Sequence, residues 1–113
     1  MTLVPVMHVL DQKRDKEQYG WPKIVPYDAS GVANAKALEA SRYIDAVNFA
    51  SRCKAQAIMS VGFVDSVCPP SSCYAAYNLL KGKKEMINEP LMGHAAPAHI
   101  QKAFLDFVRR SLQ

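Results

Sequence analysis

A short apolar run, Ala57 to Val61, is the clearest strand signal along the chain, and Gly62 ends it. Two consecutive prolines stand a few residues later, where the fixed φ of proline suits the start of a helix. The pattern predicts that helix over Ser71 to Lys81, and Gly82 follows at the position of a C-cap glycine. The centre of the chain therefore reads as a strand followed by a helix.

A second strand and a second helix complete this pattern. Met86 and Ile87 give the segment Glu85 to Glu89 an apolar centre, which predicts a short strand. A loop containing His94 follows, and a helix is predicted over Ala98 to Ser111. The apolar positions of that helix recur with helical spacing and form one stripe: Ile100, Ala103, Phe104, Phe107 and Val108.

The first third of the chain is less regular. An edge strand is predicted over Leu3 to Met7, and the prolines within Trp21 to Pro26 favour an extended segment. Two short helices are predicted over Asn34 to Arg42 and Ile44 to Ser51, the second with apolar contacts from Ile44, Val47, Phe49 and Ala50. We expect one domain over residues 1–113, with a loop-rich segment at 1–33 and a helix and βαβα core at 34–113.

Alternating strands and helices with short loops predict an α/β fold with a right-handed parallel βαβ unit. The carboxyl ends of adjacent parallel strands lie at one edge of the sheet, where open α/β sheets bind ligands. Asp65 follows the first strand and His94 follows the second. The sequence therefore predicts that these two side chains meet.

An aspartate that accepts a hydrogen bond from the Nδ1–H of a histidine fixes the imidazole tautomer and leaves the other nitrogen to act as a general base. This arrangement makes Asp65 and His94 candidate catalytic residues. Two structural interpretations stay open: Asp65 could cap the helix that follows it, and His94 could be a turn residue beside Gly93. His8 and His99 show no comparable pattern.

Composition excludes several classes of function. Half of the 113 residues are hydrophobic, as in globular proteins, and the longest apolar runs are too short to span a bilayer. The start lacks a basic leader and a cleavage site, which predicts no signal peptide and a cytoplasmic location by default. The net charge is +4, but the basic residues are scattered without interleaved aromatic residues. We therefore expect neither a membrane nor a nucleic acid as partner.

The three cysteines, Cys53, Cys68 and Cys73, form no Cys-x-x-Cys pair. Their odd number and spacing predict reduced, partly buried thiols, with no disulfide framework, no metal site and no cofactor. Cys68 lies close to Asp65 along the chain, so a Cys–His hydrolase stays open as an alternative.

Three segments resemble the acetyl xylan esterase and cephalosporin C deacetylase family: Arg42 to Ala50, Val61 to Ser71 and Tyr74 to Asn78. The resemblance extends from about Gly20 to the C-terminus and includes an Asp-x-x-Cys-Pro-Pro motif and a later Gly-His pair. It implies a partial α/β-hydrolase fold, with a short parallel sheet of two or three strands and flanking helices. By this resemblance, Asp65 is the acid and His94 the base of a triad.

Two features depart from that family. The family carries its serine nucleophile on a Gly-x-Ser-x-Gly turn, which this sequence lacks, and Ala95 follows His94 where the family usually has Glu. We therefore expect the truncated C-terminal portion of a carbohydrate esterase, inactive alone, that acts on an acetylated carbohydrate when a separate N-terminal half completes it. The alternative is a non-catalytic α/β remnant that acts in self-association or binding. An exposed edge strand also predicts a homo-oligomer.

Overall fold

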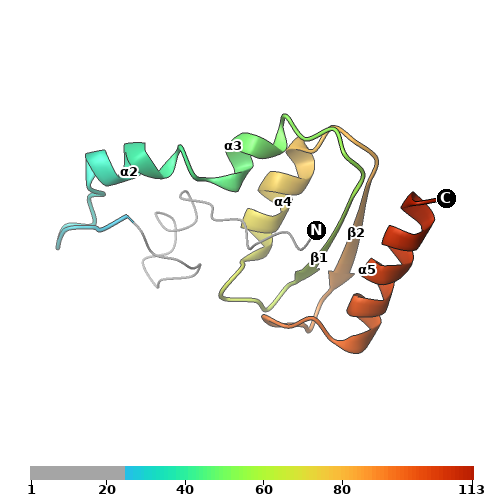
Figure 1. The fold of residues 1–113 in the computed structure, drawn as a ribbon. Coiled ribbons are helices and arrows are strands. Elements are labelled where there is room, and N and C mark those ends of the chain that lie inside the picture. Colours follow the sequence, from blue (N-terminus) through green and yellow to red (C-terminus); the bar gives the residue numbers. More distant parts are fainter. Residues whose placement is uncertain (1–24) are drawn as a thin grey trace.

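The computed structural model describes residues 25–113, and its centre is a sheet of two parallel strands (Figure 1). Strand β1 (Ala57–Gly62) pairs with β2 (Lys84–Glu89), in a register that runs from Ala57 opposite Lys84 to Gly62 opposite Glu89. Helix α4 (Pro70–Leu79) connects the two strands. The α/β class and the parallel βαβ unit predicted from the sequence are confirmed.

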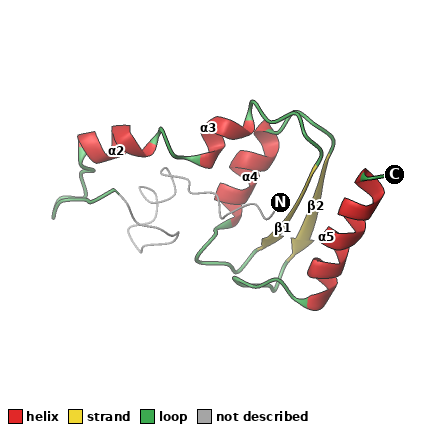
Figure 2. Ribbon diagram, viewed as in Figure 1, coloured by secondary structure: helices red, strands yellow, loops and turns green. Residues whose placement is uncertain are grey.

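The sheet is covered on both sides, as parallel sheets usually are. Helices α4 and α5 (Ala98–Ser111) lie on opposite sides of it, and Figure 2 shows the same layers by type of element. On the α4 side, Met59 and Val61 of β1 belong to one buried cluster with Cys73 and Ala76 of α4. This packing holds the carboxyl ends of both strands in a fixed position.

Helix α5 has the bounds that the sequence predicted, but its apolar stripe is only partly covered. Ile100 is fully buried and Phe107 nearly so, while Val108 is largely exposed. Two strands among the described residues make a narrow sheet, so one margin of the stripe has no neighbour to pack against.

Helices α2 (Ala35–Ser41) and α3 (Ala46–Ala50) are shorter than predicted because an amide and a carboxylate cap set their starts. Asn34 Oδ1 accepts a hydrogen bond from the N–H of Ala37, and Asp45 Oδ1 accepts one from the N–H of Val47, both at 3.0 Å. Asp45 thereby leaves Ile44 outside α3. The apolar contacts predicted for Ile44 and Phe49 are wrong, since both side chains are exposed.

The predicted role of Gly82 is also wrong. Leu80, in extended conformation, ends α4, and Gly31 is the glycine with a positive φ among residues 25–113. A Cβ on Gly82 would lie 2.1 Å from the carbonyl oxygen of Ala55, so the position needs glycine because two backbones approach closely there.

The edge strand predicted over Leu3 to Met7 and most of the loop-rich segment 1–33 lie outside the described residues. The assignment of residues 1–113 to one domain therefore stays a prediction. Within residues 25–113, no helix combines the length and apolar content needed to cross a bilayer.

Candidate active site

Asp65 lies in the loop that follows β1 and is held there by its own turn. Its Oδ1 atom accepts hydrogen bonds from the backbone N–H groups of Val67 and Cys68, each at 2.8 Å. The backbone N–H of Asp65 donates to the carbonyl oxygen of Gly62 at 3.2 Å. Its side chain is only 8% exposed. Short-range bonds of this kind are typical of aspartate in turns, and they fix the direction of the carboxylate.

His94 lies in the loop between β2 and α5, and this loop rests against the end of β1. The N–H of Val64 donates to the carbonyl oxygen of Met92 at 3.3 Å. A Cβ on Gly62 would lie 2.1 Å from that same Met92 oxygen, so glycine at the end of β1 gives the loop the room it needs. The close approach of the two loops brings His94 within reach of Asp65.

The two predicted site residues meet, with His94 Nδ1 lying 3.0 Å from Asp65 Oδ2. A carboxylate can only accept at this distance, so Nδ1 carries the proton and donates it. The imidazole is 52% exposed, which leaves Nε2 as a basic nitrogen accessible to a reactant. Asp65 caps the turn with one oxygen and contacts His94 with the other, so the turn-capping interpretation is confirmed and the catalytic one stays a prediction.

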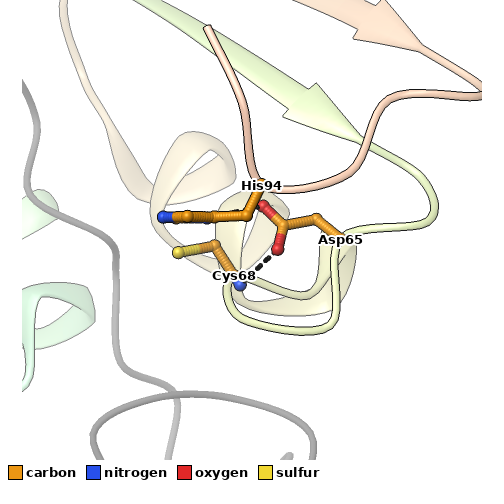
Figure 3. A group of neighbouring side chains, drawn as sticks. All are labelled: Asp65, Cys68 and His94. Atoms are coloured by element: carbon orange, nitrogen blue, oxygen red, sulfur yellow. Dashed lines mark hydrogen bonds and ion pairs between the residues drawn. The ribbon is translucent and has the colours of Figure 1, made fainter.

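Cys68 lies against the same pair, with its sulfur on one side of the imidazole (Figure 3). Burial raises the pKa of its thiol to about 12, with further contributions from the negative charge of Asp65 and from Cys73. The thiol is therefore protonated at neutral pH, which argues against Cys68 as a nucleophile. All three cysteines are free thiols, as the sequence predicted.

A second histidine–carboxylate pair lies near this edge of the sheet. His99 Nε2, in the first turn of α5, is 2.8 Å from Glu89 Oε1 at the end of β2. The sequence analysis did not single out His99, although the same logic applies: an acidic residue ends a strand and a histidine follows one loop later. His8 lies outside the described residues.

Several of the basic residues are paired with acidic ones on the surface of α5. Lys102 Nζ lies 2.6 Å from Asp106 Oδ2, and Arg110 bonds both carboxylate oxygens of Glu85 at 3.2 Å. Exposed pairs of this kind contribute little stability. These basic side chains therefore lie on exposed surface and pair with acidic side chains of the same chain.

The loops, the register and the Asp65–His94 pair can now be set beside known proteins. The family model described as acetyl xylan esterase matches residues 16–110, which is most of the chain. The chain belongs to the acetyl xylan esterase family. This confirms the resemblance that the sequence motifs carried.

Individual members of the family agree with this assignment. The acetyl esterase Axe7A of Xylanibacter ruminicola is 38% identical over 52 residues, 46% of this family member and 12% of the relative. The acetyl xylan esterase from Paenibacillus sp. R4 superposes with a TM-score of 0.64 at 36% identity, covering 66% of this chain and 24% of that one. Acetyl xylan esterase 1 from Thermoanaerobacterium sp. JW/SL YS485 superposes with a TM-score of 0.62 at 29% identity, covering 88% of this chain and 28% of that one.

Two conclusions follow for this acetyl xylan esterase family member. Its βαβ unit is part of an α/β-hydrolase fold, as expected from the resemblance. It also spans only between an eighth and roughly three tenths of the length of these relatives.

Proposed function

We propose that this chain supplies the acid and the base of an esterase that removes acetyl groups from carbohydrates. The observation that carries the proposal is the 3.0 Å contact between Asp65 Oδ2 and His94 Nδ1, in a chain that belongs to the acetyl xylan esterase family. The names of the related proteins supply the substrate class, since they are acetyl or acetyl xylan esterases.

His94 carries the proton transfers of the proposed reaction. Its Nε2 takes the proton of a serine hydroxyl as the serine oxygen attacks the acetyl carbonyl carbon. The resulting imidazolium is stabilised by Asp65 and returns the proton to the departing sugar alcohol. Water then hydrolyses the acetyl-serine through the same base, which releases acetate and restores the serine.

We propose that the serine lies on an N-terminal part of the hydrolase that residues 1–113 do not contain. None of the five glycines begins a Gly-x-Ser-x-Gly sequence, so residues 1–113 carry no such nucleophile turn. A base without a nucleophile has no covalent route, and the chain alone is therefore expected to be inactive.

A chimera tests this proposal. The part of this chain that matches the Paenibacillus sp. R4 esterase replaces the matched segment of that esterase, so that a serine supplied by the rest of the esterase would face Asp65 and His94. We expect hydrolysis of p-nitrophenyl acetate and of acetylated xylan by the chimera, and only background rates from the 113-residue chain. Asp65→Asn is expected to lower kcat of the chimera by about 10⁴-fold, because the imidazole adopts the wrong tautomer.

His94→Gln should abolish the activity, and His99→Gln provides the matched control because it removes the other histidine of this edge. Circular dichroism and size-exclusion chromatography establish that each chimera is folded. A folded chimera that is inactive, or one whose activity survives His94→Gln, would contradict the proposal.

A non-catalytic role in association is the second candidate, and exposed apolar side chains favour it. Phe63, Val64 and Leu91 are all exposed in the two loops that carry the Asp65–His94 pair. Apolar groups gathered near a site are typical of a surface that another chain covers. We propose that this surface meets either the separate N-terminal half or a second copy of the chain.

A further inference from the structure

Three different metal-ligating side chains converge where the two loops meet. The carboxylate of Asp65, the sulfur of Cys68 and a ring nitrogen of His94 each offer one donor atom, and these atoms all lie within 4.8 Å of one another. Cys68 is buried and the Asp65 side chain nearly so, while the His94 side chain is half exposed to solvent. The group therefore has two fixed members and one accessible side.

The spacing suits a single tetrahedral ion. Bonds of about 2.0–2.3 Å to oxygen, nitrogen and sulfur place neighbouring donor atoms roughly 3.3–3.7 Å apart. Asp65 Oδ2 and His94 Nδ1 are already 3.0 Å apart. The Cys68 sulfur lies within 4.8 Å of a donor atom on each of the other two residues, so it must approach them by no more than about 1.5 Å to complete the tetrahedral spacing.

We propose that Asp65 Oδ2, Cys68 Sγ and His94 Nδ1 form a site for a thiophilic divalent cation such as Zn²⁺, and that this cation switches off the base. The ion takes the place of the proton between Asp65 and His94. The thiol of Cys68 releases its proton to solvent, and the imidazole proton moves from Nδ1 to Nε2. His94 Nε2 then has no lone pair with which to accept the proton of a nucleophile.

The donor set predicts which ions bind. One sulfur, one nitrogen and one oxygen, with a fourth position open to water, suit Zn²⁺ and Cd²⁺. Mg²⁺ and Ca²⁺ prefer shells of six or more oxygen ligands and are not expected to bind. Binding does not depend on the proposed esterase activity, whereas the blocking of the base does rest on it.

Cadmium titration of the reduced 113-residue chain tests the site, because a Cd²⁺–thiolate bond gives an ultraviolet charge-transfer band. We expect a band that saturates at one Cd²⁺ per chain, is competed away by Zn²⁺ and is unaffected by Mg²⁺. Cys68→Ser should remove it, while the matched variants Cys53→Ser and Cys73→Ser should retain it. A band that persists in Cys68→Ser, or no saturable band in the wild-type chain, would overturn the proposal.

His94→Gln is a second variant, chosen because the exposed imidazole can be replaced without disturbing the core. We expect it to weaken Cd²⁺ binding by more than about tenfold, whereas His99→Gln leaves the affinity unchanged. In ¹⁵N spectra, Zn²⁺ should move the His94 proton from Nδ1 to Nε2. Unchanged affinity in His94→Gln would refute the site.

The consequence for catalysis is measured in the chimera described above. Zn²⁺ should inhibit the wild-type chimera, and Cys68→Ser should relieve that inhibition at the same Zn²⁺ concentration. An active chimera that Zn²⁺ inhibits equally with and without Cys68 contradicts this site. An inactive chimera contradicts the esterase proposal instead and leaves the cadmium and ¹⁵N results to decide the metal site.

Discussion

Asp65 divides its two carboxylate oxygens between two tasks. Oδ1 accepts hydrogen bonds from the N–H groups of Val67 and Cys68, and Oδ2 lies against His94 Nδ1. Because the first task fixes the carboxylate in its turn, the second oxygen has a defined direction before any substrate binds. Orientation of this kind is what a triad acid supplies to its histidine.

The two tasks can be separated by substitution. Asp65→Ala removes the carboxylate that accepts the N–H groups of Val67 and Cys68 and should lower the free energy of unfolding by about 1–2 kcal/mol. Asp65→Asn keeps one carbonyl oxygen for the same N–H groups, so its loss of stability should be clearly smaller. Urea unfolding of both variants measures the difference. Equal losses would mean that the turn does not depend on the Oδ1 bonds.

Cys68 should make stability fall at alkaline pH. Burial and the neighbouring Asp65 charge raise the pKa of its thiol to about 12, against about 8.5 for an unfolded cysteine. Between these values the folded chain binds more protons than the unfolded chain, so the free energy of unfolding decreases as pH rises. Below the pKa of the unfolded state the Cys68 thiol is protonated in both states, so it does not make the free energy of unfolding depend on pH there.

Urea unfolding at pH 7 and pH 10 tests this pH dependence. Cys68→Ser should flatten part of the decrease, and Cys53→Ser is the matched control for the loss of one thiol. Identical slopes in wild type and Cys68→Ser would show that the thiol titrates normally.

At the residue scale, the meeting of Asp65 and His94 could be predicted because it needs only parallel neighbouring strands, which the order of elements specifies. The Glu89–His99 pair has the same order of strand-end acid and later histidine, but its contact could not be predicted, nor could the placement of the Cys68 sulfur beside the imidazole. Both depend on how a loop folds back onto its own strand, and local sequence patterns do not determine that path. The need for glycine at position 62 is likewise visible only once the loop lies against β1.

Helix α4 is joined to β2 by a lysine that no pattern singled out. Lys84, the first residue of β2, donates from Nζ to the carbonyl oxygens of Tyr77, Asn78 and Leu80 at 2.8, 3.2 and 3.1 Å. These carbonyls lie at the C-terminal end of α4, where the helix dipole also favours a cation. The contact fixes the helix end relative to the strand that precedes the His94 loop.

Replacing this lysine should therefore destabilise the βαβ unit. Lys84→Met keeps most of the aliphatic stem but removes the charged donor, and we expect a loss of about 1 kcal/mol because the site is partly exposed. Lys83→Met is the matched control, because Lys83 is the residue next to Lys84 and its side chain is exposed. Thermal and urea unfolding measure both variants. Equal losses of stability in Lys84→Met and Lys83→Met would mean that the removal of a surface charge, and not the bonds of Lys84 to α4, causes the loss.

At the element scale, the sequence predicted α4, α5 and both strands to within two residues at each end, because apolar period and proline mark them directly. The helices α2 and α3 are also placed to within two residues, and capping by Asn34 and Asp45 sets their starts. Gly82 was misassigned because a glycine that permits close approach looks the same in sequence as one that ends a helix.

The described residues leave much apolar surface uncovered. Figure 1 shows α2 standing away from the sheet, and the sheet itself has two strands. Large apolar side chains are exposed on three parts of the molecule: Tyr43, Ile44 and Phe49 near α3, Phe63, Val64 and Leu91 in the loops, and Leu105, Val108 and Leu112 at α5. Surface of this kind tends to associate with another chain.

We therefore expect the isolated chain to self-associate with rising concentration. Sedimentation velocity over a wide concentration range should show an increasing mean mass, and Val64→Asp with Leu91→Asp should reduce it. Leu112→Asp, at the far end of α5, serves as a control for added charge. A compact monomer at all concentrations would contradict the proposal that a second copy of the chain covers this face.

The central claim is that Asp65 holds the proton of His94 on Nδ1 and leaves Nε2 basic. The most direct measurement is the ¹⁵N imidazole spectrum of the metal-free chain at a pH where the ring is neutral. The account predicts a protonated Nδ1 and an unprotonated Nε2 for His94, with the preference lost in Asp65→Asn. A His94 ring protonated on Nε2 in the wild-type chain would contradict it.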